Sequence, residues 1–252
     1  MNTSLLRSIG APLALGLLVL VGWQILVVAG DIQPYLLPAP TAIATQLALV
    51  APVLWPAVLA TGSNALIGLL VGSVVAIAIA LVASRLRFID DLVTPVVAAI
   101  AVVPIVALAP VLTTMFGATS ETPRRVIVAI VVFVPVFVNT LRGLRQVLPV
   151  HRDLMRSYAA TNWQLSRTVT IPGALPYLFT GLNIASSLAV ISAIVAEYFG
   201  GLQNGLGSRI TSAAANSAYP RAWAYVVGAI LLGVVFYIAT LAMEKAVSRR
   251  TG

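Results

Sequence analysis

Long stretches without a charged residue constrain this chain more than any other feature. Between Arg7 and Asp31 lie 23 uncharged residues, and about 20 apolar residues suffice for a helix to cross the roughly 30 Å of hydrocarbon in a membrane. Only 9% of the 252 residues are charged and 60% are hydrophobic, whereas about a quarter of the residues in a soluble domain are charged. This composition excludes a disordered chain and argues against a soluble enzyme. It predicts an all-α, polytopic membrane protein.

The few charges divide the chain into six predicted membrane spans within a single transmembrane domain, residues 1–252. The spans cover approximately residues 11–29, 61–83, 92–115, 126–141, 175–196 and 222–243. Five prolines between positions 34 and 56 predict an irregular external connection before the second span. A cleaved signal peptide is the alternative for the first span, but its apolar stretch exceeds the usual length of about 7–15 residues and no hydrophilic domain follows it. We therefore expect the first span to be retained.

Lys and Arg residues predict the orientation of these spans. With six spans, eleven of the 15 lie on one side and four on the other. The eleven are Arg7, Arg85, Arg87, Arg142, Arg145, Arg152, Arg156, Arg167, Lys245, Arg249 and Arg250; the four are Arg124, Arg125, Arg209 and Arg221. Because cytoplasmic loops carry an excess of Lys and Arg, both termini and the segment between Arg142 and Arg167 are predicted to face the cytoplasm.

Residue counts exclude several kinds of chemistry on this chain. It has no Cys, and its one His (His151) and one Lys (Lys245) have no Gly-rich turn or metal-ligand pattern around them. We expect no catalytic residues, no metal site and no cofactor here, so a separate polypeptide must bind ATP and Mg²⁺ if ATP drives transport. Buried acidic residues usually mark ion coupling, and none lies deep in a predicted span. Glu197, at the end of the fifth span, comes nearest.

The segment of residues 152–172 carries the most specific signal. Leu154 and Tyr158, and likewise Met155 and Ala159, are spaced to share one face of a short amphipathic helix. Pro172 is expected to end the helical structure of this segment. An apolar face outside the spans indicates either a docking surface or a helix lying among lipid headgroups.

The same segment resembles the permease subunits of bacterial binding-protein-dependent ABC importers. Their motif is Glu-Ala-Ala, three residues, Gly, nine residues, Ile, any residue, Leu-Pro. The corresponding residues here are Asp153, Leu154, Met155 and Ala159, followed by Val169, Ile171 and Pro172. The spacing is kept, while Leu and Met replace the two alanines and Ala replaces the glycine.

Other stretches resemble the nitrate/sulfonate/taurine branch of this family and extend the resemblance over nearly the whole chain. They are LLPAPTAIATQL, PIVALAPVLTTMFG, WQLSRTVTIPGALPYLFTGL and AEYFGGLQNGLG. The order and spacing of these stretches carry more information than any one of them.

The resemblance implies an alternating-access importer in the inner membrane of a bacterial cell. Two permease subunits would form the path, with a second copy of this chain favoured and a different permease left open. Two ATP-hydrolysing subunits would dock on the cytoplasmic loops, and an extracytoplasmic binding protein would deliver the solute. The expected ATPase contacts are Leu154, Met155, Tyr158 and Ala159, and Asp153 is expected to cap the helix. Membrane lipid is the other expected partner, and nucleic acid is not one.

Residues on the translocation path are predicted from polar side chains within spans. Asn139, Asn183, Ser186 and Ser187 are the candidates, and hydrogen bonding between helices is the alternative role for them. Glu197 is the candidate external gate, in a stretch up to Gly207 that either controls the path or contacts the binding protein; a simple glycine-rich turn is the alternative. Gly68 and Gly72 are spaced for close helix packing.

Two other classes of membrane protein are alternatives to the importer. A passive channel or a secondary transporter would need no ATPase docking segment, and an intramembrane enzyme would need converging catalytic groups that this chain lacks. The solute is not decided by the sequence. The resemblance covers small anions such as nitrate, sulfonates and taurine, and also pyrimidine precursors of thiamine and riboflavin.

Overall fold

The computed structural model describes residues 3–251, with side chains described for residues 10–104 and 106–247. Within residues 3–251 every regular element is helical, which confirms the all-α class. The elements are α1 (Thr3–Ala29), α2 (Pro40–Arg85), α3 (Arg87–Ala101), α4 (Ile105–Phe116), α5 (Thr122–Arg145), α6 (Pro149–Ser157), α7 (Asn162–Leu165), the π-helix η1 (Ser166–Thr170), α8 (Ile171–Tyr198), α9 (Leu206–Ala215) and α10 (Tyr219–Thr251). The side chains of Arg7, Arg249 and Arg250, used above for orientation, lie outside the described set.

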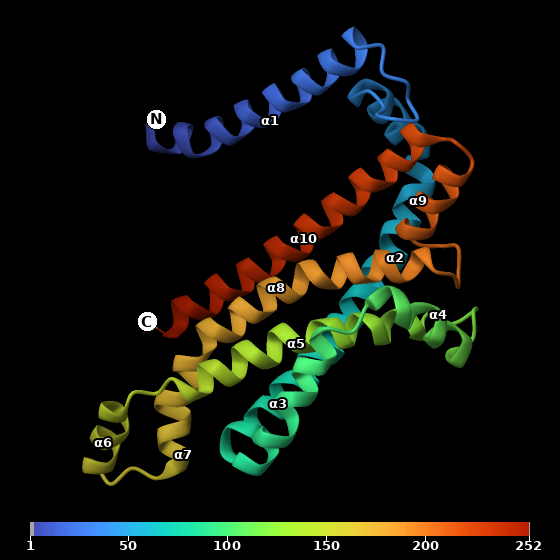
Figure 1. Ribbon diagram of the computed structural model, residues 1–252. Coiled ribbons are helices and arrows are strands. Elements are labelled where there is room, and N and C mark those ends of the chain that lie inside the picture. The colour runs from blue at the N-terminus through green and yellow to red at the C-terminus, as the bar shows by residue number, and fades with distance from the viewer. Residues whose placement is uncertain (1–2, 252) are drawn as a thin grey trace.

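Six candidate spans are present in this range. Helices α1, α2, α5, α8 and α10 are each long and apolar enough to cross a membrane, and α3 with α4 forms a sixth candidate that is bent by 102° at its break. Pro104 stands at that break as the residue preceding α4, where it has no N–H to continue the hydrogen bonding of α3. Helices α2, α5, α8 and α10 pack together, while most of α1 lies apart from them (Figure 1).

The prediction of an irregular connection before the second span was wrong for most of that stretch. Helix α2 begins at Pro40 and runs for 46 residues through Pro52 and Pro56. Pro40 suits the first helical turn, where no N–H is needed. Each of the two internal prolines removes one backbone N–H donor from the helix. In an apolar environment the helix is still favoured, because unwinding it would leave more backbone groups without hydrogen bonds. Only the connection between Gly30 and Ala39 is irregular.

The predicted helix stop at Pro172 was also wrong. Pro172 lies in the first turn of α8 and Pro176 lies inside it, so residues 162–198 form one continuous helical span. The N–H of Ile171 reaches back five residues to the carbonyl of Ser166. This wider π turn lies directly before the proline ring, whose clash with the preceding turn would otherwise break an α-helix.

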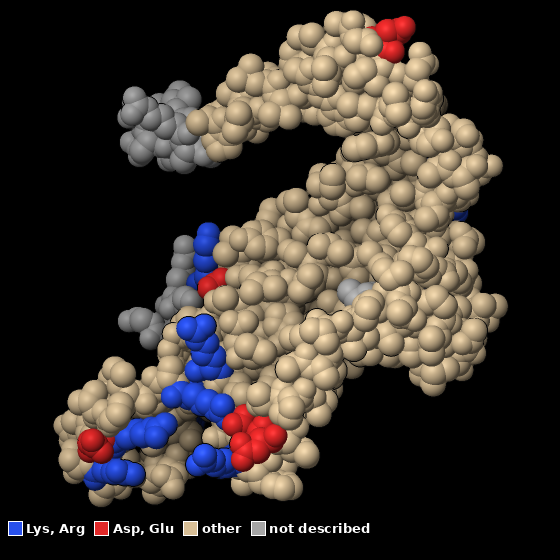
Figure 2. Space-filling view, viewed as in Figure 1, with Lys and Arg blue, Asp and Glu red and all other residues tan. Residues whose placement is uncertain are grey.

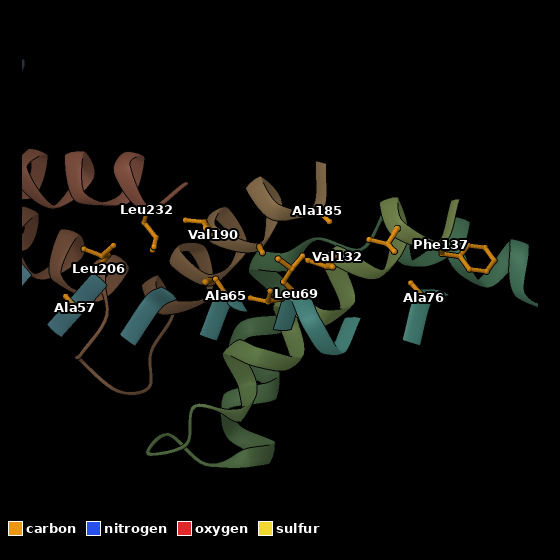
Figure 3. Close-up of a cluster of buried hydrophobic side chains, with 14 of the residues drawn as sticks. Ala57, Ala65, Leu69, Ala76, Val132, Phe137, Ala185, Val190, Leu206 and Leu232 are labelled. Carbon is orange, nitrogen blue, oxygen red and sulfur yellow. The ribbon is translucent and has the colours of Figure 1, made fainter. Parts of the chain in front are cut away.

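Small residues let the central helices approach closely, as the spacing of Gly68 and Gly72 predicted. A Cβ atom added at Gly68 would overlap the side chain of Val128, and one at Gly72 would overlap the backbone of Ala129. Both contacts join α2 to α5, next to the buried cluster that includes Leu69 and Val132 (Figure 3). Backbone contact of this kind is a main source of helix association in membranes.

Replacing Gly68 with valine should therefore separate α2 from α5. We expect the free energy of unfolding to fall by about 1–3 kcal/mol, the usual cost of overpacking, and the midpoint of a thermal melt followed by tryptophan fluorescence to fall with it. Gly16→Val is the matched control, because a Cβ atom at Gly16 meets nothing within 4 Å. Equal melting of the two variants would contradict the close contact.

Candidate functional site

The segment from α6 to η1 extends beyond the ends of α5 and α8, the two helices that it connects (Figure 1). Most of the Lys and Arg residues visible in Figure 2 gather over this end of the molecule. We call residues 149–172 the α6–α7 segment.

Helix α6 presents apolar side chains to its surroundings. None of its residues is buried, and Leu154 and Tyr158 are 53% and 76% exposed. Pro149 starts the helix at a position where the missing N–H costs nothing. An exposed apolar surface outside the spans is typical of a contact site for another protein.

Hydrogen bonds fix the end of α6 in a Schellman motif. The Ala159 N–H donates to the carbonyl of Arg156 at 2.9 Å, and the Ala160 N–H donates to the carbonyl of Met155 at 3.0 Å. This geometry needs a left-handed residue, and Ala159 has a φ of 52°. Glycine adopts that conformation without strain. The backbone therefore explains why the importer motif has glycine at the position that Ala159 occupies here.

A capping box then starts α7. The hydroxyl of Thr161 accepts from the N–H of Gln164 at 3.3 Å, and the Gln164 amide oxygen accepts from the N–H of Thr161 at 2.7 Å. These reciprocal bonds satisfy two of the donors that a helix start leaves free. Both ends of the short turn between α6 and α7 are thus held in place.

The two halves of the motif meet around a groove of about 410 Å³ between α6 and the start of α8. Leu154 and Met155 line it from α6, and Val169 and Pro172 line it from η1 and α8. Tyr158 and Ala159 lie at the end of α6, outside the groove lining, and Ile171 is 40% exposed. The structure therefore brings together four of the eight predicted contact residues.

The prediction that Asp153 caps this helix was wrong. Helix α6 starts at Pro149, so Asp153 lies in its middle, and Leu148 occupies the capping position without a side-chain hydrogen bond. The carboxylate lies 3.5 Å from the guanidinium of Arg156, with both side chains largely exposed. Such a surface pair adds little to stability. The proline at position 149 is the signal that places the helix start earlier.

Glu197 belongs to a buried polar network at the opposite end of α8. Its side chain is 1% exposed. The Thr61 hydroxyl donates to the carboxylate at 2.9 Å, and the N–H of Gly207 donates to it at 2.7 Å. Thr61 in turn accepts from the N–H of Leu206 at 2.8 Å. The carboxylate therefore caps the start of α9 from another helix, at its positive end.

Close approach of Glu197 explains the Gly-Leu-Gly stretch. A Cβ atom added at Gly205 would overlap the Glu197 carboxylate, and one at Gly207 would overlap the carbonyl of Ile194. Only glycine lets the backbone come this near. The alternative of a simple glycine-rich turn does not account for these contacts.

A second network, centred on Glu121, holds the loop before α9. Asn64 and Asn204 each donate to the Glu121 carboxylate at 2.7 Å, and Arg124 pairs with it at 2.8 Å. Arg124, which is 2% exposed, also donates to Asn204 and to the carbonyl of Leu202. Burial raises the pKa of Glu121. The hydrogen bonds from Asn204 and Asn64 and the charge of Arg124 lower it by more than burial raises it, so the pKa lies below its ordinary value.

Sequence reasoning missed Thr61 as a partner of Glu197, and it missed the second network of Asn64, Glu121, Arg124 and Asn204. The spacing of Glu121 and Arg124 within one helical turn was the available signal. Their partners lie far away along the chain.

The four predicted path residues do not converge. Asn183 donates to Glu244 of α10 at 2.8 Å, and Ser186 accepts from Thr240 of the same helix at 3.2 Å, which matches the interhelical alternative for these two. Asn139 donates to the carbonyl of Pro135 within its own helix. Ser187 lines an apolar groove between α8 and α10. The path role of these residues stays a prediction.

Comparison with known families decides the class of protein. Residues 68–252 match the family described as the inner membrane component of binding-protein-dependent transport systems. The chain belongs to this family. It is a permease subunit of an ABC importer and a multi-pass inner membrane protein.

Three relatives and one solved structure illustrate the similarity of this permease to known proteins. It is 30% identical over 244 residues to the riboflavin transport system permease protein RibX of Chloroflexus aurantiacus, covering 96% of this chain and 90% of RibX. It is 32% identical over 217 residues to the formylaminopyrimidine transport permease protein ThiX of Halalkalibacterium halodurans, covering 84% and 85%. It is 25% identical over 189 residues to the taurine transport system permease protein TauC of Escherichia coli, covering 72% and 68%.

The structural neighbour is a crystal structure of an amino acid ABC transporter with histidines. It superimposes with a TM-score of 0.60 at 19% identity, over 81% of this chain and 95% of the other. This likeness concerns the fold alone. The resemblance of the sequence to ABC permeases, including the branch that contains TauC, is confirmed.

Proposed function

We propose that this permease forms the translocation path of an ATP-driven importer and that the α6–α7 segment transmits the conformational change of the ATPase to it. The observation that carries the proposal is the pairing of an exposed apolar helix with fixed ends and a groove that joins it to the start of α8. A partner that binds Leu154 and Tyr158 would move a segment that is continuous with a membrane span. Rigid-body motion of α8 is the expected consequence.

The proposed arrangement places the α6–α7 segment and both termini in the cytoplasm, following the excess of Lys and Arg at this end. An ATP-binding subunit contacts the segment there. A solute-binding protein docks at the opposite end, near the buried networks of Glu197 and Glu121. A second copy of this chain completes the path.

The proposed solute is a small planar nitrogen heterocycle. The support is that RibX and ThiX, whose names specify riboflavin and formylaminopyrimidine, are each at least 30% identical over more than four fifths of this chain. TauC, named for taurine, is less similar. Calorimetry on the binding protein encoded beside this permease decides the matter: binding of taurine, sulfonate or nitrate and not of a heterocycle would overturn the assignment.

Uptake into liposomes tests the coupling itself. The permease is reconstituted with the ATP-binding subunit and the binding protein encoded with it, and solute accumulation is measured with ATP and with a non-hydrolysable analogue. Accumulation that requires hydrolysis is the expected result. Flux without ATP would indicate a passive channel, and flux that follows an imposed ion gradient would indicate a secondary transporter.

A further inference from the structure

An open groove of about 460 Å³ runs between α3 and α5, apart from the sites described above. Its walls are apolar along the membrane-spanning part of α5, where Val134, Val138 and Leu141 face Ala98 and Ala101 of α3. Thr94, Arg142 and Arg145 also line the groove, and the two arginines belong to the last turn of α5 at its α6 end. The groove is therefore apolar along its length and basic at one end.

The charges at this end are not equivalent. Arg145 pairs with Asp90 at 2.7 Å, and Asp90 also accepts from Thr94 at 3.0 Å. Arg142 is exposed and makes no hydrogen bond or ion pair with any residue that the structure describes. Its guanidinium therefore offers a full set of N–H donors for an anion.

We propose that this groove binds one anionic phospholipid, with an acyl chain along the apolar wall and the phosphate on Arg142. A polar solute would lose hydrogen bonds to water against such a wall without replacing them, whereas an acyl chain loses none. Basic sites between membrane helices recognise anionic headgroups in this way. The proposal rests on the membrane spans and on Arg142, and it does not depend on the coupling role of the α6–α7 segment.

Native mass spectrometry of the full chain in detergent tests the proposal directly. Phosphatidylglycerol and phosphatidylcholine with the same acyl chains are titrated separately. We expect phosphatidylglycerol to bind more tightly, and Arg142→Gln to weaken its binding about fivefold, the effect of one basic residue near a charged headgroup. Arg152→Gln, which removes the same charge from α6, should leave the affinity unchanged.

A second variant separates the acyl chain from the headgroup. Ala98→Phe fills the groove from an exposed position and keeps Arg142, and it should reduce retention of both lipids while the tryptophan melting curve stays that of the parent. Equal binding of the two lipids, or no effect of Arg142→Gln, would overturn the proposal. So would disulfide formation between copies carrying Ala98→Cys, because the chain has no other Cys and the bond would show that a second copy fills the groove.

Discussion

Replacing Ala159 with arginine should reduce ATP-driven uptake at least about tenfold while leaving the permease folded in the membrane. Ala159 is exposed and already left-handed, so the longer side chain meets no part of its own fold. At a docked surface the added charge loses water without gaining a partner, which costs several kcal/mol. Co-purification with the ATP-binding subunit and uptake into liposomes measure the loss.

Two companion variants make this result specific. Ser217→Arg introduces the same side chain at another exposed, left-handed residue, with a φ of 57°, in the turn that follows α9, and it should keep the ATP-binding subunit attached. Ala159→Gly relieves the left-handed strain and should keep full uptake. Retained assembly and uptake by Ala159→Arg would show that the end of α6 is not the contact.

The spans could be predicted because charge is so costly in a membrane that a handful of Arg and Asp residues marks the boundaries. The predictions that prolines would interrupt the helices were wrong for a related reason. The helix penalty of proline is measured in water, where an open backbone is solvated, and Pro52 and Pro56 lie in an apolar helix, where that alternative is unfavourable. Pro172 is accommodated differently, in the first turn of α8 directly after a π turn. The prediction that Asp153 caps α6 was wrong because Pro149, a residue suited to the first turn of a helix, starts α6 four residues earlier.

The buried networks could not be predicted in the same way. Glu121 bonds to Asn64 and Asn204, which are 57 and 83 positions away in sequence, and Thr61 lies 136 positions from Glu197. Nothing local in the sequence selects these partners. The Gly-Leu-Gly stretch was visible, but its reason, the approach of a carboxylate from another helix, required the fold.

Replacing Glu197 with alanine should destabilise the permease by about 2–6 kcal/mol. The change leaves the Thr61 hydroxyl and the Gly207 N–H buried without their acceptor, and each such donor costs about 1–3 kcal/mol. Helix α9 also loses the acceptor that caps its start. A thermal melt followed by tryptophan fluorescence, together with the yield of monodisperse protein, measures the effect.

Conservative variants show whether the network or the charge is responsible. Glu197→Gln keeps an acceptor for Gly207 and should lose much less stability than Glu197→Ala. Gly205→Ala leaves every polar group in place but overlaps the carboxylate, so it should approach the loss seen with Glu197→Ala, while Gly233→Ala, whose Cβ meets nothing within 4 Å, should not. If Glu197→Gln is stable but uptake falls, Glu197 also acts as the external gate. If uptake by that variant is unchanged, the role of Glu197 is structural only.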